Sequence, residues 1–182
     1  MSAFVERAVG RYSHLLSNDT NTETPHERVK KLIKEGESKK VEFKSSLRTN
    51  MFTNQVDKNV EHASLKTIAA YLNSDGGTLL IGVGDKGEIA GIEKDNFVSH
   101  DKLSLHFTNL LKEHLGPEFL PFVDHKILEM DGKNIVAVEC KKSPKEAFLK
   151  IGKDEHFYVR NGPASIPMAG SSLIDYITHR FR

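Results

Sequence analysis

The chain has 182 residues, a length typical of one domain, since a chain of this size buries roughly 70% of the surface that its unfolded form exposes. Hydrophobic residues make up 38% and charged residues 28%, which excludes a disordered or collagen-like chain. No apolar run approaches the roughly 18 residues of a membrane-spanning helix. A single cysteine cannot form an internal disulfide bond, so the sequence favours a reducing, cytoplasmic location without membrane association.

The net charge of +1 conceals an uneven distribution along the chain. Residues 1–60 carry 11 Lys/Arg against 8 Asp/Glu, residues 61–140 carry 7 against 13, and residues 141–182 carry 8 against 4. Basic ends that flank an acidic middle are typical of a nucleic-acid binder whose acidic groups gather at one place. Ordinary solvated surface charge is the alternative explanation.

Apolar periodicity, capping residues and turn residues define the predicted elements. Thr24 can cap a helix whose first turn accepts Pro25, and Gly36 ends that helix. Asp131-Gly132 is a favoured hairpin turn between two strands. We expect five helices in chain order: one at residues 3–16, one from Thr24 to Gly36, one that ends near residue 73, one from Ser99 to Gly116 and one around Leu173–Ile177. We expect strands at residues 39–46, 78–83, 88–92, 122–130, 134–140, 147–151 and 155–160.

This order of elements predicts an α+β domain with a largely antiparallel, mixed sheet flanked by helices. Residues 17–24 are polar and rich in turn-forming residues, so residues 1–24 are predicted to form an N-terminal helical arm and loop. Residues 25–182 are predicted to form the domain. Within it, residues 78–83 suit one buried strand, and residues 88–92 are expected to be its hairpin partner.

The context excludes a nucleotide cofactor and a zinc site. Gly82–Gly87 matches the G-x-G-x-x-G pattern, but that pattern must open a helix, and the residues after it favour a strand. The chain has no G-x-x-x-x-G-K-[ST] loop to hold a nucleotide phosphate. The nine histidines do not cluster at zinc spacing, and Cys140 lies in an apolar strand, where it is typical of a core residue.

Several further motifs occur in a specific order. Glu37–Lys44 (ESKKVEFK) is followed by an Ala-containing helix that ends at Asn73, and then by Gly76–Val83 (GGTLLIGV) and Asp85. Phe157–Gly162 (FYVRNG) closes the series. Together these motifs resemble the Schlafen-type AlbA-like domain, and the resemblance covers about residues 28–181.

The resemblance implies a nucleic-acid-binding fold. In the Schlafen branch, three acidic residues make the domain a metal-dependent endoribonuclease of transfer and ribosomal RNA, and the matching positions here are Glu37, Glu42 and Asp85. It therefore implies a site for Mg²⁺ or Mn²⁺, hard cations that prefer carboxylate oxygens. Gly84 departs from the family pattern, because relatives often carry a second acid there. Many bacterial relatives are described only as DNA-binding domains, often within regulators.

The spacing of the acids limits how they can meet. Glu37 and Glu42 are five residues apart, so in one continuous strand they would face opposite sides. They converge only if Glu37 lies in the turn before the strand and Asp85 approaches from the tip of the following hairpin. A structural explanation stays open, since Glu42 can pair with Lys44 or Lys39, and Asp85 suits an ordinary hairpin turn.

Basic residues near these acids are candidates for contacts with nucleic acid. Lys44 shares the strand face of Glu42 and is expected to hold the scissile phosphate or to stabilise developing charge. Arg160 is expected to clamp a backbone phosphate through two of its guanidinium nitrogens. The remaining candidates for salt-sensitive, sequence-independent contact are Lys39, Lys40, Arg48, Lys141, Lys142 and Lys145.

The leading hypothesis is a metal-dependent endoribonuclease that cuts structured RNA such as transfer RNA. The alternatives are a non-catalytic, regulatory DNA- or RNA-binding domain and a protein-interaction domain that uses the helix at residues 3–16. Because the resembling nucleases carry two lobes in one chain, this single lobe is expected to act as a homodimer. The helix at residues 3–16 either packs across that interface or folds back onto its own core.

Overall fold

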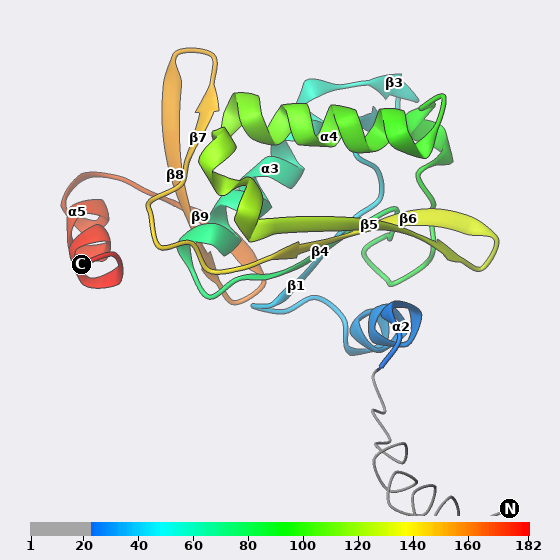
Figure 1. The fold of residues 1–182 in the computed structure, drawn as a ribbon, viewed down its shortest axis with the longest axis horizontal. Helices are drawn as coiled ribbons and strands as arrows, with labels where there is room; N and C mark the ends of the chain where they lie inside the picture. The colour runs from blue at the N-terminus through cyan, green and yellow to red at the C-terminus, as the bar shows by residue number, and fades with distance from the viewer. Residues whose placement is uncertain (1–22) are drawn as a thin grey trace, which may run out of the picture.

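The computed structural model describes residues 23–182 (Figure 1). The expected helix at residues 3–16 lies outside the described residues, so its role in a homodimer or as an interaction arm stays a prediction. The elements in chain order are α2 (Pro25–Glu35), β1 (Val41–Lys44), β2 (Thr49–Asn50), β3 (Gln55–Val56), α3 (Lys58–Asn73), β4 (Gly77–Ile81), the 3-10 helix η1 (Glu93–Asp95), α4 (His100–His114), the 3-10 helix η2 (Pro117–Phe122), β5 (Val123–Met130), β6 (Lys133–Cys140), β7 (Phe148–Ile151), β8 (Asp154–Asn161), β9 (Ala164–Met168) and α5 (Gly170–Arg180).

The strands form one four-stranded sheet and two smaller ones. The main sheet has the order β1-β4-β6-β5, in which β1 runs parallel to β4 and the other two pairs are antiparallel. β7, β8 and β9 form an antiparallel sheet, and β2 and β3 form a short hairpin. The single parallel pair exists because α3 returns the chain from the end of β1 to the start of β4. The expected α+β fold is confirmed.

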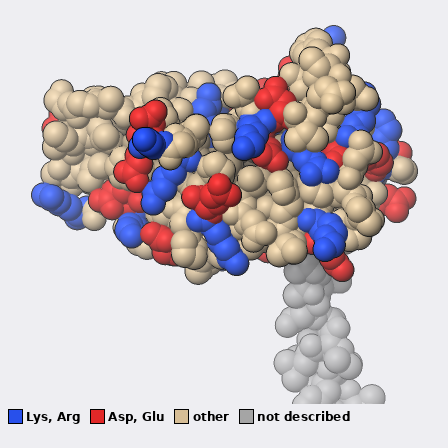
Figure 2. Space-filling model, turned by 90° about the horizontal axis from the view of Figure 1, so that it is seen from above, with Lys and Arg blue, Asp and Glu red and all other residues tan. Residues whose placement is uncertain are grey.

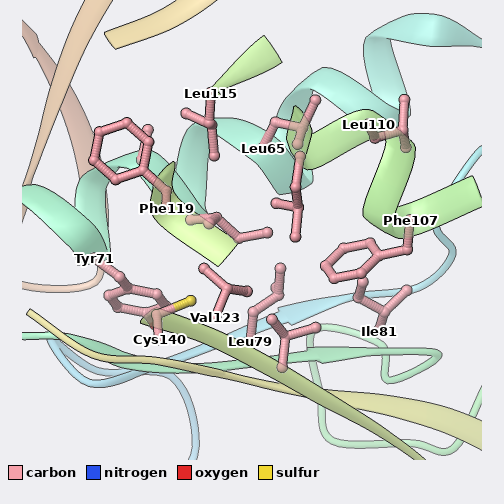
Figure 3. Close-up of a cluster of buried hydrophobic side chains, with 14 of the residues drawn as sticks. Leu65, Tyr71, Leu79, Ile81, Phe107, Leu110, Leu115, Phe119, Val123 and Cys140 are labelled. Atoms are coloured by element: carbon pink, nitrogen blue, oxygen red, sulfur yellow. The ribbon is translucent and has the colours of Figure 1, made fainter. Parts of the chain in front are cut away.

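Helices cover the two faces of the main sheet unequally. α3 and α4 pack on one face, and α2 lies against the other (Figure 1). The larger core lies between the sheet and α3 and α4, where Leu65, Leu79 and Phe107 are at most 1% exposed (Figure 3). α2 buries only Val29, in a smaller core with Phe43 and others. None of the described helices combines the length and apolarity needed to cross a membrane.

The segment after β4 differs from the expected hairpin. Residues 88–92 do not form a strand, and Val83 and Ile89 make one isolated β-bridge. Gly82 and Gly91 have φ angles of 93° and 79°, which bend the chain on both sides of that bridge. The prediction of a strand at residues 88–92 was therefore wrong, and the strand expected to reach residue 83 ends at Ile81.

Three short strands have no counterpart among the predicted elements. β2 and β3 contain two residues each, too few to show an alternating pattern. β9 contains Pro167, which is tolerated because β9 is an edge strand of its sheet.

β1 was predicted but is shorter than expected, because it covers only half of residues 39–46. Ser38 N–H donates to the Val41 carbonyl at 2.9 Å and closes a turn before the strand.

Asn73, the last residue of α3, joins that helix to the sheet of β7, β8 and β9 and to α5. Its fully buried side-chain amide donates to the Ala147 carbonyl at 2.8 Å and to the Tyr158 carbonyl at 2.9 Å, and it accepts from Ala147 N–H at 2.8 Å. The Tyr176 hydroxyl of α5 donates to the Asn73 backbone carbonyl at 2.8 Å. One residue therefore holds three elements that are distant in the sequence.

Replacing Asn73 by alanine is expected to lower the free energy of unfolding by about 2–4 kcal/mol, because each buried backbone group left without a partner costs about 1–3 kcal/mol. Denaturant unfolding followed by circular dichroism measures this change. Asn161→Ala, at the exposed end of β8, is the matched control and should change stability by less than about 0.5 kcal/mol. Equal losses in the two variants would contradict this role of Asn73.

Candidate functional site

Lysines gather around Asp75, which lies in the turn between α3 and β4. Lys39 Nζ lies 3.0 Å from an Asp75 carboxylate oxygen, and Lys40 Nζ donates to the Asp75 backbone carbonyl. The hydrogen bond from Lys39, together with the charges of Lys39, Lys40 and Lys142, holds the pKa of Asp75 below its usual value. Asp75 therefore stays ionised and draws the lysines toward one point.

Asp75, Lys40 and Lys142 border a groove of about 480 Å³ between α2, the start of β1 and the end of β6. Arg28 and Glu139 form an ion pair of 2.9 Å at the same groove. We call this site the basic groove. Its basic lining residues are Arg28, Lys40, Lys141 and Lys142, and Lys39 joins them through its contact with Asp75. The opposing carboxylates are those of Asp75 and Glu139. Positive charge therefore prevails in it.

Gly76 lets the turn that carries Asp75 pack directly against the end of β6. Its φ angle is +73°, and its N–H donates to the Tyr71 carbonyl at 3.0 Å. A Cβ atom at this position would overlap the Cys140 carbonyl oxygen and lie 3.2 Å from Lys142 N. Glycine is therefore required both for the backbone angle and for the close approach that brings Asp75 beside the lysines.

A second cluster of charges lies on β1. Both carboxylate oxygens of Glu42 are engaged: Oε2 lies 2.6 Å from Arg160 Nη2, and Oε1 lies 2.5 Å from Lys44 Nζ. The side chains of Arg160, Glu42 and Lys44 are 1%, 12% and 27% exposed. Glu42 pairs in register with Leu79, which belongs to the larger core, so it lies on the α3 side of the sheet.

The guanidinium of Arg160 connects β8 to the start of β1 from inside the domain. Nη2 also donates to the carbonyls of Ser38 at 2.9 Å and Val41 at 3.3 Å, and Nη1 donates to Ser165 Oγ at 3.1 Å. The guanidinium carbon lies 5.0 Å from the centre of the Tyr71 ring. In this geometry Arg160 is not available to a phosphate at the surface, in contrast to the expected clamp.

Glu37 lies in the turn before β1, where the spacing argument requires it to be. Its Oε1 accepts a hydrogen bond from Phe43 N–H at 2.9 Å. β1 is an edge strand, so this carboxylate satisfies a backbone donor that has no neighbouring strand to pair with. Glu37 therefore has a structural role in the observed arrangement.

Asp85 is exposed in the turn after β4 and approaches Lys44 rather than the basic groove. The two residues line a separate groove of about 340 Å³ that also includes the β2–β3 hairpin. At Gly84, where relatives often carry an acid, an added Cβ would overlap the Glu88 carboxylate. The Glu88 carboxylate, from four residues later in the chain, therefore occupies the space that a side chain at position 84 would need.

The carboxylates expected to bind Mg²⁺ or Mn²⁺ do not fit such an ion as they are arranged. Across residues 23–182, no three His, Cys, Asp or Glu side chains lie close enough together to hold a metal ion. Both oxygens of Glu42 contact cationic side chains, and one oxygen of Glu37 contacts the backbone. Metal binding at these positions would require the ion pairs to be broken.

Two other predicted contact residues are engaged elsewhere. Arg48 Nε donates to the Asp95 carbonyl at 2.8 Å, and its guanidinium carbon lies 3.8 Å from the centre of the Phe97 ring. Lys145 pairs with Glu118 at 3.2 Å. Of the predicted basic contacts, the structure brings together Lys39, Lys40, Lys141 and Lys142, and it leaves Arg48, Lys145 and Arg160 apart from them.

Three charged residues of the basic groove were missed by the sequence analysis: Arg28, its partner Glu139, and Asp75. Arg28 lies on the polar side of α2, where the periodic pattern indicates only exposure to solvent. Asp75 lies in an Asn-Ser-Asp-Gly-Gly turn, which has an ordinary composition for the end of a helix. Only the packing of α2 and β6 beside this turn brings the three residues together, so no local signal identifies them.

Comparisons with known proteins agree with this fold. The profile of the family described as "Schlafen, AlbA_2" matches residues 37–169. None of the curated proteins matches the chain. The DIP2311 protein from Corynebacterium diphtheriae has a similar structure, with a TM-score of 0.55 and 15% identity over 98% of this chain and 29% of that one. The N-terminal domain of a RecG-related DNA helicase protein from Nitrosomonas europaea has a TM-score of 0.50 and 18% identity over 80% of this chain and 90% of that one.

These identities are low, so the two structures support the fold alone. The chain spans less than a third of the length of the Corynebacterium protein. The family profile covers most of the described domain, from Glu37 in the turn before β1 to Ala169 before α5.

Arg160→Ala is expected to lower the free energy of unfolding by about 3–5 kcal/mol, because it leaves the largely buried Glu42 carboxylate without its cationic partner. Denaturant unfolding measures the effect. Lys145→Ala removes the same charge from an exposed pair and should cost less than about 1 kcal/mol. If Arg160→Ala were as stable as the unmodified chain, the buried pair would not connect β8 to β1 in the way described.

Proposed function

The chain belongs to the Schlafen AlbA_2 family, and on that premise we propose that it is a nucleic-acid-binding domain whose contact surface is the basic groove. RNA is the favoured ligand and DNA the second. The observation that carries the proposal is the gathering of five basic side chains against two carboxylates around the turn at Asp75. Phosphate contacts of this kind supply affinity without reading the sequence of the nucleic acid.

Lys141 and Lys142 are the residues most available to a phosphate. Both are exposed, and within residues 23–182 neither forms an ion pair with a carboxylate. Lys39 and Lys40 contact Asp75, for which a phosphate can compete. The face on the α4 side offers a contrast, since Figure 2 shows Lys and Arg intermixed there with Asp and Glu.

Replacing both Lys141 and Lys142 by alanine is expected to weaken RNA binding and to flatten its dependence on salt. Each lost phosphate contact should reduce the slope of log K against log salt by about 0.7 for a single strand. Fluorescence anisotropy over a range of salt concentrations measures both quantities. The double variant Lys102→Ala, Lys112→Ala removes the same charge from α4. Equal effects in the two double variants would indicate net charge rather than the basic groove.

A metal-dependent endoribonuclease acting on structured RNA such as transfer RNA is the second candidate function. One observation favours it: Lys44 and Asp85 line one groove, and Glu42 contacts Lys44 beside it. In that position Lys44 can hold a phosphate or stabilise charge that develops on it. The acids do not fit a metal ion as arranged, so no step is assigned to one.

Because the carboxylates are occupied, transfer RNA is expected to stay intact with Mg²⁺, with Mn²⁺ and with a chelator, and the divalent cations are expected to weaken binding only by competing for the phosphates, as other salts do. Anisotropy and gel analysis of the same samples measure binding and cleavage. Asp85→Asn is the informative variant, since Asp85 is exposed and its replacement leaves the Arg160–Glu42 pair in place. Cleavage that requires the cation and disappears in Asp85→Asn would establish the endoribonuclease instead.

A further inference from the structure

The tip of the β2–β3 hairpin exposes apolar side chains that the fold does not use. Phe52 is 100% exposed, and Met51 and Val56 on the same hairpin are 37% and 63% exposed. Single exposed apolar residues are common and need no explanation. Here, three of the seven large hydrophobic residues that are exposed in the described part of the chain lie within six consecutive positions.

The hairpin tip is ordered by its own hydrogen bonds rather than by Phe52. Asn50 Oδ1 accepts from Phe52 N–H at 3.0 Å and from Thr53 N–H at 3.3 Å. The Asn50 carbonyl accepts from Asn54 N–H at 2.8 Å, and Asn54 has a left-handed φ angle of 58°. The backbone therefore presents the Phe52 side chain to solvent in a defined position.

The base of the hairpin is anchored by a buried carboxylate. Asp95 is 0% exposed, and its oxygens accept from the backbone N–H groups of Leu47 at 2.8 Å, Arg48 at 3.0 Å and Thr49 at 2.9 Å. A buried carboxylate is tolerated only when it is hydrogen-bonded in this way. These hydrogen bonds hold the hairpin against η1, and the exposed apolar side chains at its tip do not take part in this anchoring.

Phe52 borders the groove of about 340 Å³ that Lys44, Asn50 and Asp85 also line. A nucleobase matches the chemistry of this site, since its face can stack on the Phe52 ring and its polar edge can donate to the exposed Asp85 carboxylate. The Lys44 ammonium provides positive charge for the attached phosphate.

We propose that the β2–β3 hairpin is a stacking site for an unpaired nucleobase, with Phe52 as the stacking side chain. The proposal rests on the proposed nucleic-acid-binding function and adds that the ligand is a single strand or a loop. Bases within a duplex already stack on one another, and recognition of individual bases depends on unpaired ones.

A tryptophan reporter tests this directly, because the chain contains no tryptophan. In Phe52→Trp, single-stranded RNA is expected to quench the indole fluorescence on the order of twofold through stacking, and the same sequence as a duplex is expected to leave it unchanged. Ile174→Trp is the control. Ile174 is 66% exposed on α5, at the end of the molecule opposite β3 (Figure 1), and its fluorescence should not respond.

Phe52→Ala supplies the second readout. It is expected to weaken binding of the single strand about tenfold while the affinity for the duplex and the salt dependence stay the same, since the phosphate contacts remain. Normal, salt-dependent binding without quenching in Phe52→Trp would overturn the stacking site and leave the proposed function intact. Binding of neither RNA would overturn both. Self-association that Phe52→Ala abolishes, without quenching by RNA, would assign the hairpin to protein contact and overturn the proposal.

Discussion

The buried guanidinium of Arg160 joins the main sheet of this domain to the sheet of β7, β8 and β9. It binds the Glu42 carboxylate on β1, the Ser38 carbonyl in the turn before β1 and the Ser165 hydroxyl on β9. A cation 1% exposed needs the Glu42 carboxylate as its partner, because an unpaired buried charge is strongly destabilising. The turn that carries Lys39 and Lys40 is therefore positioned by a side chain that lies 122 positions after Ser38.

This constraint separates the charges of the domain into two groups. Glu37, Glu42 and Arg160 satisfy backbone groups or one another, so they stabilise the fold and offer little to a ligand. Lys141 and Lys142 remain exposed at the basic groove, where their charges are available to a phosphate. Exposed charges are screened by salt and buried ones much less, so binding and stability are expected to respond differently to ionic strength.

Features that depend on neighbours in the chain were determined by the sequence itself. Thr24 and Glu27 form the capping box that starts α2, and Ser99 caps α4. Asp131-Gly132 forms the two-residue turn between β5 and β6. Each of these rests on hydrogen bonds or backbone angles within a few residues, which composition and spacing specify. The family profile confirms the resemblance to the Schlafen family. The sequence could show this resemblance because the family motifs are also local and occur in the right order.

Features that join distant segments were decided only by the tertiary structure. The alternation along β1 placed Glu42 and Phe43 on opposite faces of the strand. It could not show that β8 would bring Arg160 against the Glu42 carboxylate. The sequence likewise could not show that the lysines before β1 and those after β6 would lie beside the turn at Asp75. The physical reason is that a charged side chain carries no local signal of its partner. Whether it becomes a structural ion pair or a surface for ligands depends on which segments pack beside it and on how much water remains.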